Sequence, residues 1–256
     1  MKKEQLAAQL YTVRAHTQTP QDFADTLKKV KDIGYPAVEI SGHAPIADAE
    51  LAKILSGEGL VCCSSHESGE DLFNRPEAVI ARMNELGCKT ATFPWPGGIR
   101  FDTLEDITAF ASQLEQAGRT LKSAGIGFCY HNHHMEFRRI GNRTVMEILF
   151  DAVPSDFMSA ELDTYWIQFG GGNPVAWCER MSGRLGLLHM KDYVINEQNE
   201  VMFAEVGSGN LDWPAIVKAA DSAGCNWFVP EQDETAGDPF DSLRKSYDYI
   251  CESLMQ

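Results

Sequence analysis

The sequence predicts an α/β protein that folds as a single (β/α)8 TIM barrel spanning residues 1–256. Short apolar runs alternate with longer stretches in which apolar residues recur at helical spacing, and about eight such units fill the chain. Side chains capable of chemistry follow directly after most of these runs, as they do at the carboxyl ends of barrel strands. The alternative is a doubly wound open sheet, but no GxGxxG or GxxxxGKS/T motif supplies the phosphate-binding loop of its nucleotide-binding versions.

The eight predicted strands are short apolar runs, and each is followed by a predicted helix. The strands cover residues 6–13, 37–40, 60–65, 90–93, 125–130, 158–162, 185–189 and 227–229. The helices cover residues 20–33, 47–57, 76–86, 103–124, 144–152, 173–181, 212–223 and 240–254. The first helix shows the signals used: Pro20 stands in its first turn, apolar residues follow at helical spacing, and Gly34 ends it.

Composition and charge argue against several classes of protein. The net charge of −15 disfavours nucleic-acid binding, because phosphate backbones are bound by clustered Lys and Arg. No apolar run approaches the roughly 20 residues that cross a bilayer, so we expect no membrane association. The basic N-terminus lacks a following apolar segment, and the seven cysteines include no CxxC pair. We therefore expect no signal peptide, reduced thiols and a cytoplasmic location.

The segment 128–137, which reads FCYHNHHMEF, is the most informative part of the sequence. It begins in the last residues of the fifth predicted strand, and three of the chain's seven histidines follow directly after that strand together with Glu136. Imidazole is the commonest metal ligand in proteins and the only side chain whose unperturbed pKa lies near neutrality. The segment therefore predicts a metal or acid–base site, and the alternative is a polar loop whose histidines hydrogen-bond only the backbone.

Three later strands each end in a possible metal ligand: Asp163, His189 and Glu231. Each residue alone is weak evidence, because an aspartate after a strand is often a helix N-cap and a lone histidine is usually structural. In a barrel, however, these strand ends converge on one mouth beside the histidines of strand five. Carboxylates with one or two imidazoles suit Mn²⁺, Co²⁺, Zn²⁺ or Mg²⁺ with open positions for substrate oxygens.

Other residues at predicted strand ends are candidates for substrate contact, although each could instead be a loop anchor or a surface group. The candidates are Tyr11, His66, Trp95 and His131, with Lys191 placing a charge near the substrate. The glycine-rich segment 205–209 is interpreted first as loop geometry and only then as a substrate contact. The remaining histidines, His16, His43 and His134, are interpreted as structural.

Six motifs together resemble the sugar phosphate isomerase/epimerase superfamily, the xylose-isomerase-like barrels that include AP endonuclease family 2-like members. The motifs are QLYTVR (9–14), YHNHHMEF (130–137), LDT (162–164), LHMKD (188–192), EVGSG with DW (205–209 and 212–213) and VPEQD (229–233). The resemblance covers nearly the whole chain. It implies one divalent metal ion bound by a Glu, Asp, His and Glu set from strands five to eight, and a small sugar or keto-sugar as substrate.

Three members of that ligand set match residues of this chain directly: Asp163, His189 and Glu231. The first glutamate does not, because Tyr130 stands where the epimerases carry it near the end of strand five. We assign this ligand to Glu136. If Glu136 instead matches the substrate-side glutamate of the epimerases, His131 or His133 completes the metal shell or the site holds metal weakly.

The resemblance implies proton transfer next to a carbonyl through an enediolate, with Glu231 and Glu136 as the acid–base pair and His133 or Lys191 as substitutes. Isomerisation, epimerisation and elimination from an inosose or a 3-keto-glycoside share this intermediate, so the sequence does not separate them. A metal-free sugar-binding barrel is the alternative outside enzymes, and a phosphodiesterase acting on abasic DNA is disfavoured by the charge. Family members often form homo-oligomers, but the sequence fixes no subunit number.

Overall fold

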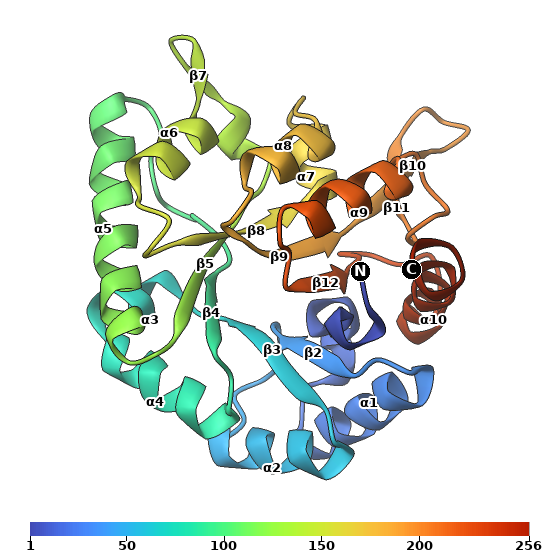
Figure 1. Ribbon diagram of the computed structural model, residues 1–256. Coiled ribbons are helices and arrows are strands. Elements are labelled where there is room, and N and C mark those ends of the chain that lie inside the picture. Colours follow the sequence, from blue (N-terminus) through green and yellow to red (C-terminus); the bar gives the residue numbers. More distant parts are fainter. Residues whose placement is uncertain (256) are drawn as a thin grey trace.

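The computed structural model describes residues 1–255 and confirms the predicted (β/α)8 barrel (Figure 1). The barrel strands are β1 Ala7–Gln9, β2 Ala37–Ile40, β3 Val61–His66, β4 Thr90–Phe93, β5 Gly127–His131, β8 Ser159–Asp163, β9 Leu185–Met190 and β12 Trp227–Pro230. They form one parallel sheet in that order. A parallel bridge between Leu6 and Phe228 brings the first and last strands together, so the barrel is nearly closed.

The first predicted strand, residues 6–13, is wrong over most of its length. Only Ala7–Gln9 form β1, and the chain then turns into a 3-10 helix over Leu10–His16. The side chain of Gln9 caps that turn by accepting a hydrogen bond of 3.1 Å from the backbone N–H of Tyr11. Leu10 and Val13 are fully buried in the turn, and a short apolar run does not distinguish a strand from a buried helix.

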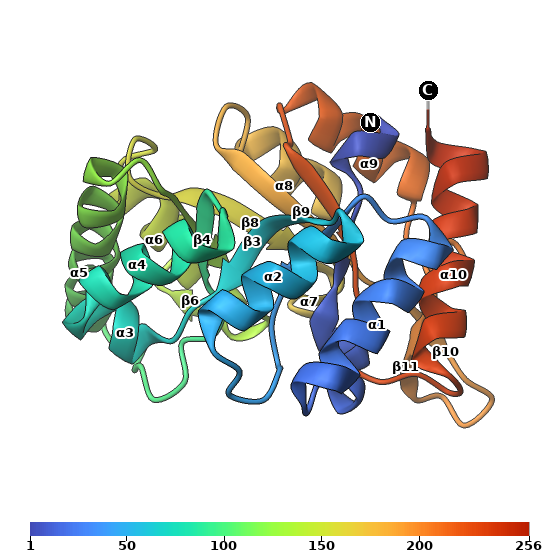
Figure 2. The same ribbon diagram turned by 90° about the horizontal axis from the view of Figure 1, so that it is seen from below.

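All eight predicted helices are present and surround the sheet (Figures 1 and 2). They are α1 Pro20–Ile33, α2 Asp48–Glu58, α4 Pro76–Leu86, α5 Leu104–Ser123, α6 Val145–Ala152, α8 Pro174–Arg180, α9 Trp213–Ser222 and α10 Pro239–Tyr249, which continues as a π-helical turn over Ile250–Leu254. Side-chain caps begin several of them; the hydroxyl of Thr103, for example, accepts the backbone N–H of Asp106 at the start of α5. No helix within residues 1–255 is long and apolar enough to cross a membrane.

The sequence did not predict several short elements, most of them in the loops between the main strands and helices. They are the 3-10 turns Lys3–Gln5 and Met135–Phe137, the helices α3 Gly69–Asn74 and α7 Thr164–Phe169, and the hairpins β6 Arg139–Ile140 with β7 Arg143–Thr144 and β10 Asp192–Ile195 with β11 Val201–Ala204. Elements this short give too few residues for a periodic pattern. Three of them, α7, the turn Met135–Phe137 and β10, follow directly on barrel strands that carry predicted site residues.

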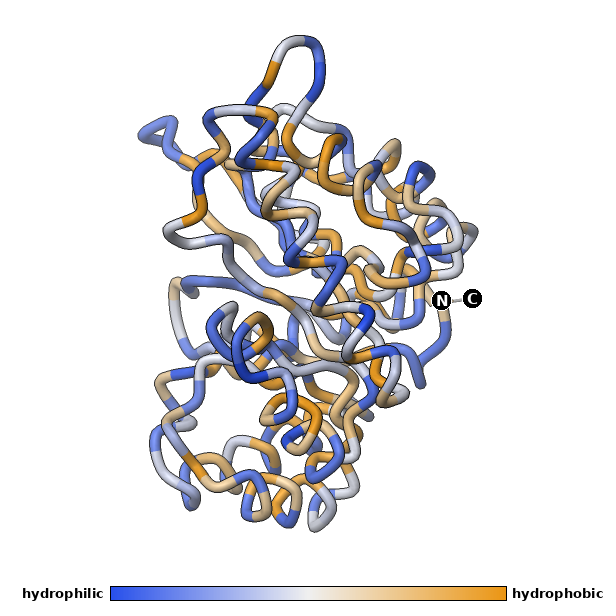
Figure 3. Tube along the Cα trace, turned by 90° about the vertical axis from the view of Figure 1, so that its left-hand side faces the viewer, coloured by the Kyte–Doolittle hydropathy of each residue, from blue (hydrophilic) through white to orange (hydrophobic). Residues whose placement is uncertain are grey.

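Apolar residues fill two regions of the interior. The larger core lies between the sheet and the helices. Polar and apolar residues alternate along the helices, as the colouring of the trace in Figure 3 shows. The smaller cluster consists of Ala7, Ala37, Cys63, Cys129, Leu187 and Val229, all contributed by barrel strands. Because side chains of a strand alternate between its faces, residues two positions further along point into the barrel as well. These residues are Gln9, Glu39, Ser65, His131, His189 and Glu231, so a buried polar layer stands above an apolar one.

Gly118 in α5 packs against the loop before β8 so closely that a Cβ would lie 1.9 Å from the carbonyl oxygen of Phe157. We expect Gly118→Ala to lower the free energy of unfolding by about 1–3 kcal/mol, although alanine is the better helix former. Gly57 in α2 faces open space, so the matched control Gly57→Ala is expected to raise it by up to about 1 kcal/mol. Urea unfolding measures both, and equal effects would contradict the close approach at Gly118.

Candidate functional site

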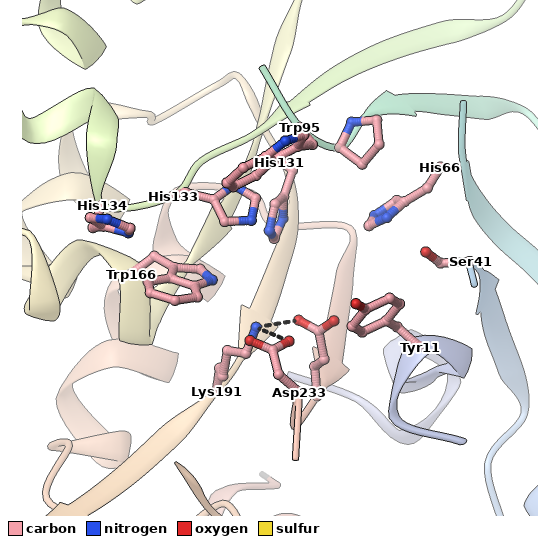
Figure 4. A pocket seen from close by; sticks show the side chains of 12 residues that line it. Tyr11, Ser41, His66, Trp95, His131, His133, His134, Trp166, Lys191 and Asp233 are labelled. Atoms are coloured by element: carbon pink, nitrogen blue, oxygen red, sulfur yellow. Dashed lines mark hydrogen bonds and ion pairs between the residues drawn. The ribbon is translucent and has the colours of Figure 1, made fainter. Parts of the chain in front are cut away.

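A cavity of about 500 Å³ opens at the carboxyl ends of the barrel strands. Its lining comes from both halves of the chain: Tyr11, Ser41, His66, Pro94, Trp95, His131, His133, His134, Trp166, Lys191, Glu231 and Asp233. Figure 4 shows His131 and His133 side by side on one wall, with Trp166 and Lys191 below them and Tyr11 and His66 on the other side. The barrel therefore brings the functional candidates from strands one, three, four, five, seven and eight to one place.

Lys191 is the main cation of this cavity. Its ammonium lies 3.0 Å from a carboxylate oxygen of Glu231, 3.3 Å from Asp163 and 2.8 Å from Asp233. Burial by itself lowers the pKa of Lys191, but the three carboxylates outweigh it and raise the pKa, so the ammonium stays charged. The three carboxylates thus form a cage that already accommodates a positive charge.

His189 connects this cage to the interior of the barrel. Its Nδ1 lies 2.9 Å from Glu231, and its Nε2 lies 2.7 Å from Glu39. Burial lowers the pKa of His189, but the neighbouring glutamates, Glu161 first among them, raise it well above its ordinary value. The imidazole therefore has a carboxylate on each side, which fixes its orientation.

Asp163, His189 and Glu231 form a group that could hold a metal ion. One ligand atom from each lies within 4.8 Å of the others, and all three side chains are buried. Oδ2 of Asp163 is buried and accepts no hydrogen bond from the described residues 1–255, and the Lys191 ammonium lies 3.3 Å from it. Burial raises the pKa of Asp163 to about 7. A buried carboxylate oxygen without a hydrogen bond, next to an imidazole and a second carboxylate, fits a divalent cation.

The structure does not bring Glu136 together with these three residues. Glu136 lies in the 3-10 turn after β5, where it is fully buried and does not line the cavity. Its carboxylate accepts hydrogen bonds from the Tyr130 hydroxyl, at 2.8 Å, and from the backbone N–H of His133, at 3.0 Å. Burial raises the pKa of Glu136 to about 7 despite these two bonds. The assignment of Glu136 as a metal ligand stays a prediction.

The predicted substrate contacts Tyr11, His66, Trp95 and His131 all line the cavity, and so does His133. His133 stacks edge-on against Trp95 with ring centroids 4.5 Å apart. Its buried position lowers its pKa, which keeps the imidazole neutral near pH 7. His134, which the sequence analysis interpreted as structural, also lines the cavity, with its ring 5.1 Å from that of Trp166.

Sequence reasoning placed Glu39 among the polar residues at strand ends, where functional side chains are expected, but gave it no role, and it did not single out the buried carboxylate of Glu161. Oε1 of Glu161 lies 2.9 Å from Nε2 of His66, 3.0 Å from Nδ1 of His131 and 3.1 Å from Nε2 of His189. Glu39 stands two residues after the inward-facing Ala37, so the period of two was the available signal for Glu39. Glu161 follows the half-buried Ser159 by two residues and offered no such signal. Trp166, Ser41 and Asp233 are further lining residues without a predicted role.

The backbone of the glycine-rich segment 205–209 is hydrogen-bonded to a side chain of the protein itself. The buried carboxylate of Asp192 accepts backbone N–H groups from Gly207 and Gly209, each at 3.1 Å, and the indole N–H of Trp213 at 2.6 Å. A Cβ at Gly209 would lie 2.1 Å from that carboxylate. The segment does not line the cavity, so its glycines serve loop geometry.

Comparisons with known proteins agree with this architecture. A family model described as xylose isomerase-like TIM barrel matches residues 27–252. The rhizopine catabolism protein MocC of Rhizobium meliloti is 23% identical over 88% of this chain and 79% of its own length. An inosose dehydratase of Bacillus thuringiensis is 28% identical over 59% of this chain, and the match spans only 55% of that enzyme. A crystal structure of a sugar phosphate isomerase/epimerase from Parabacteroides distasonis superposes with a TM-score of 0.83 at 24% identity, covering 99% of this chain and 96% of the other.

The buried Glu136 makes the stability of the metal-free protein depend on pH. Its pKa is near 4.5 in the unfolded chain and about 7 in the folded protein, so the unfolded chain releases this proton first as pH rises. The fold therefore loses stability between these pH values. Glu136→Gln keeps both hydrogen bonds possible without the charge, so its advantage over wild type should grow from pH 4.5 to pH 8 by up to roughly 3 kcal/mol.

Denaturant unfolding at several pH values measures this difference. The matched control is Glu85→Gln, which changes an exposed glutamate on α4 and should show a difference from wild type that does not change with pH. If Glu136→Gln behaved in the same way as Glu85→Gln, Glu136 would not be a buried acid.

Proposed function

Because this chain belongs to the xylose isomerase-like TIM barrel family, we propose that it is a divalent-metal-dependent enzyme that isomerises or epimerises a sugar or keto-sugar through an enediolate. The observation that carries the proposal is the buried group Asp163, His189 and Glu231, which lies beside the cavity at the carboxyl end of the barrel. The Asp163 oxygen that accepts no hydrogen bond supports a cation at this position. A bound Mn²⁺, Co²⁺, Zn²⁺ or Mg²⁺ ion would supply Lewis-acid polarisation of the substrate carbonyl.

Glu231 is suited to accept the proton that leaves the carbon next to the carbonyl. Burial alone would raise the pKa of its carboxyl, but Lys191 and His189 lower it well below its ordinary value. The carboxylate therefore stays ionised and lines the cavity at the position where Lys191 and His189 hold it. A general base needs this combination of the correct protonation state and a fixed position near the substrate.

We assign the second proton-transfer role to His133, in place of Glu136. His133 lines the cavity, stays neutral near pH 7, and its buried Nδ1 has no hydrogen-bond partner within residues 1–255. A neutral imidazole can donate a proton from one ring nitrogen and accept one at the other. Glu136 then acts indirectly, because its carboxylate holds the backbone N–H of His133.

The cavity also has groups that would bind a sugar without taking part in proton transfer. The faces of Trp95 and Trp166 can pack against the apolar face of a sugar ring, and the buried Nε1–H of Trp166 has no partner within the described chain. Lys191, next to Trp166, and Tyr11, on the other side of the cavity, present polar groups to substrate oxygens. Ligand pockets of this kind combine aromatic walls with a few placed polar groups.

Elimination of water is the second candidate function. It is favoured by the similarity to inosose dehydratase, which extends over 59% of this chain. Removal of the proton by Glu231 is common to both reactions. They differ in the second step, where His133 would protonate a leaving hydroxyl instead of returning a proton to carbon.

Two measurements test the proposal: the metal content of the protein and the exchange of a substrate proton with solvent deuterium. We expect wild type incubated with Mn²⁺ or Co²⁺ to retain metal and to exchange a substrate proton with deuterium when offered keto-sugars or inososes. Asp163→Ala and Glu231→Ala should lose both properties, with turnover falling by at least about 10²-fold. His16→Ala, which changes an exposed histidine outside the cavity, should retain both.

Elemental mass spectrometry and NMR provide the two readouts. Full turnover in Asp163→Ala or Glu231→Ala would contradict the site. A wild-type protein that binds a keto-sugar but takes up no metal would indicate a sugar-binding barrel instead. Release of water from an inosose, without return of deuterium to the remaining substrate, would identify the dehydratase reaction.

A further inference from the structure

We propose that His66, His131 and Glu161 form a second metal site beside the Asp163 group, built on Glu161 two residues before Asp163 in β8 and selective for a transition-metal dication such as Zn²⁺. The three ligands come from β3, β5 and β8, so the site exists only in the closed barrel. We call it the inner site, and the group of Asp163, His189 and Glu231 the outer site.

The three possible ligand atoms of the inner site lie close together. Oε1 of Glu161 lies 2.9 Å from Nε2 of His66 and 3.0 Å from Nδ1 of His131. Together with a ring nitrogen of His189, these atoms all lie within 4.8 Å of one another. Glu161 is fully buried, and the side chains of both histidines are less than a tenth exposed. Three protein ligands with one position left open is the arrangement typical of catalytic zinc sites.

Two buried polar atoms at this place make no well-aligned hydrogen bond within residues 1–255: Nδ1 of His131, which has only the Glu161 carboxylate oxygen at 3.0 Å, and Oε1 of Glu39. The Glu39 oxygen lies 3.4 Å from Nε2 of His66, beside the proposed ligands. Buried polar groups are nearly always satisfied, and leaving one unpaired costs about 1–3 kcal/mol. A cation bound between the histidines would satisfy His131 directly and give the Glu39 carboxylate a nearby positive charge.

The charge of the barrel interior also favours a dication. Glu39 and Glu161 are two fully buried carboxylates that face each other across His66 and His189. Burying ionised groups is costly unless they are paired, so two positive charges are required here. One divalent ion held by His66, His131 and Glu161 would supply both charges at a single position.

The inner and outer sites differ in the kind of donor. Two imidazoles and one carboxylate suit zinc, cobalt or ferrous ions, whereas the carboxylate-rich outer site also accepts Mg²⁺ or Mn²⁺. His189 borders both, but a neutral imidazole has a single lone pair and can ligate only one ion. We assign its Nδ1, which faces Glu231, to the outer site, because its Nε2–H then donates to Glu39 at 2.7 Å.

His66 and His131 both line the cavity, so the inner ion would be reachable from the substrate side. Its open position would face the cavity floor and accept an oxygen of the substrate that the outer site does not bind. The inference therefore goes beyond the proposed function, which needs only the outer site.

The experiment is zinc stoichiometry in the full-length protein. Wild type is stripped with a chelator, reloaded with Zn²⁺, freed of excess and analysed by elemental mass spectrometry; we expect about two ions per chain. Glu161→Gln and His66→Gln should each retain about one ion, and Asp163→Ala should also retain about one. The control His16→Ala, outside both sites, should retain both. Loading with Mg²⁺ in place of Zn²⁺ should fill only the outer site.

The outcomes separate this inference from the proposed function. One zinc ion that is lost in Asp163→Ala and kept in Glu161→Gln and His66→Gln overturns the inner site and leaves the proposed function intact. One zinc ion that is kept in Asp163→Ala and lost in Glu161→Gln and His66→Gln supports the inner site and contradicts the metal assignment of the proposed function. No bound zinc contradicts both. If the variants fail to fold by circular dichroism, anomalous scattering at the zinc edge from wild-type crystals decides, and the absence of a peak between His66 and His131 overturns the inner site.

Discussion

The need to balance charge inside the barrel governs the whole functional end of this protein. Four carboxylates are buried there, of which only Glu231 reaches the cavity: Glu39, Glu161, Asp163 and Glu231. Each faces an imidazole or the ammonium of Lys191 within 3.4 Å. Removing one partner from a buried pair costs about 3–5 kcal/mol, because the other charge is left uncompensated. The cluster is therefore a fixed unit whose members cannot be changed singly without consequence for the fold.

This cluster follows from the alternation of side chains along the strands. In β9, Leu187 belongs to the apolar layer and His189 to the polar layer, and the same relation holds between Val229 in β12 and Glu231, which directly follows that strand. The closely packed lower layer gives the polar layer a rigid floor. Substrate therefore approaches only from the carboxyl ends of the strands, where the loops contribute Trp95 and Trp166.

The sequence was sufficient for the fold and for the residues that end strands, but not for residues inside strands. Asp163, His189 and Glu231 could be found because each interrupts an apolar run at its end. Glu161 stands within such a run, and only the closed barrel shows that it faces His66 and His131 rather than solvent. The start of the chain was misread for a related reason, since an apolar turn and an apolar strand have the same composition.

Glu136 shows why a motif can identify a residue without fixing its role. Its predicted place in the metal shell differs from its observed place, where the carboxylate accepts hydrogen bonds from the backbone N–H of His133 and the hydroxyl of Tyr130. Tyr130 packs against Phe93 with ring centroids 5.7 Å apart, which fixes its hydroxyl beside Glu136. Moving the carboxylate into the cavity would break two hydrogen bonds and release the turn that carries His133. Glu136 can therefore either hold the turn that positions a neutral His133 or move away to bind a metal ion. The contacts of Tyr130 favour the first arrangement.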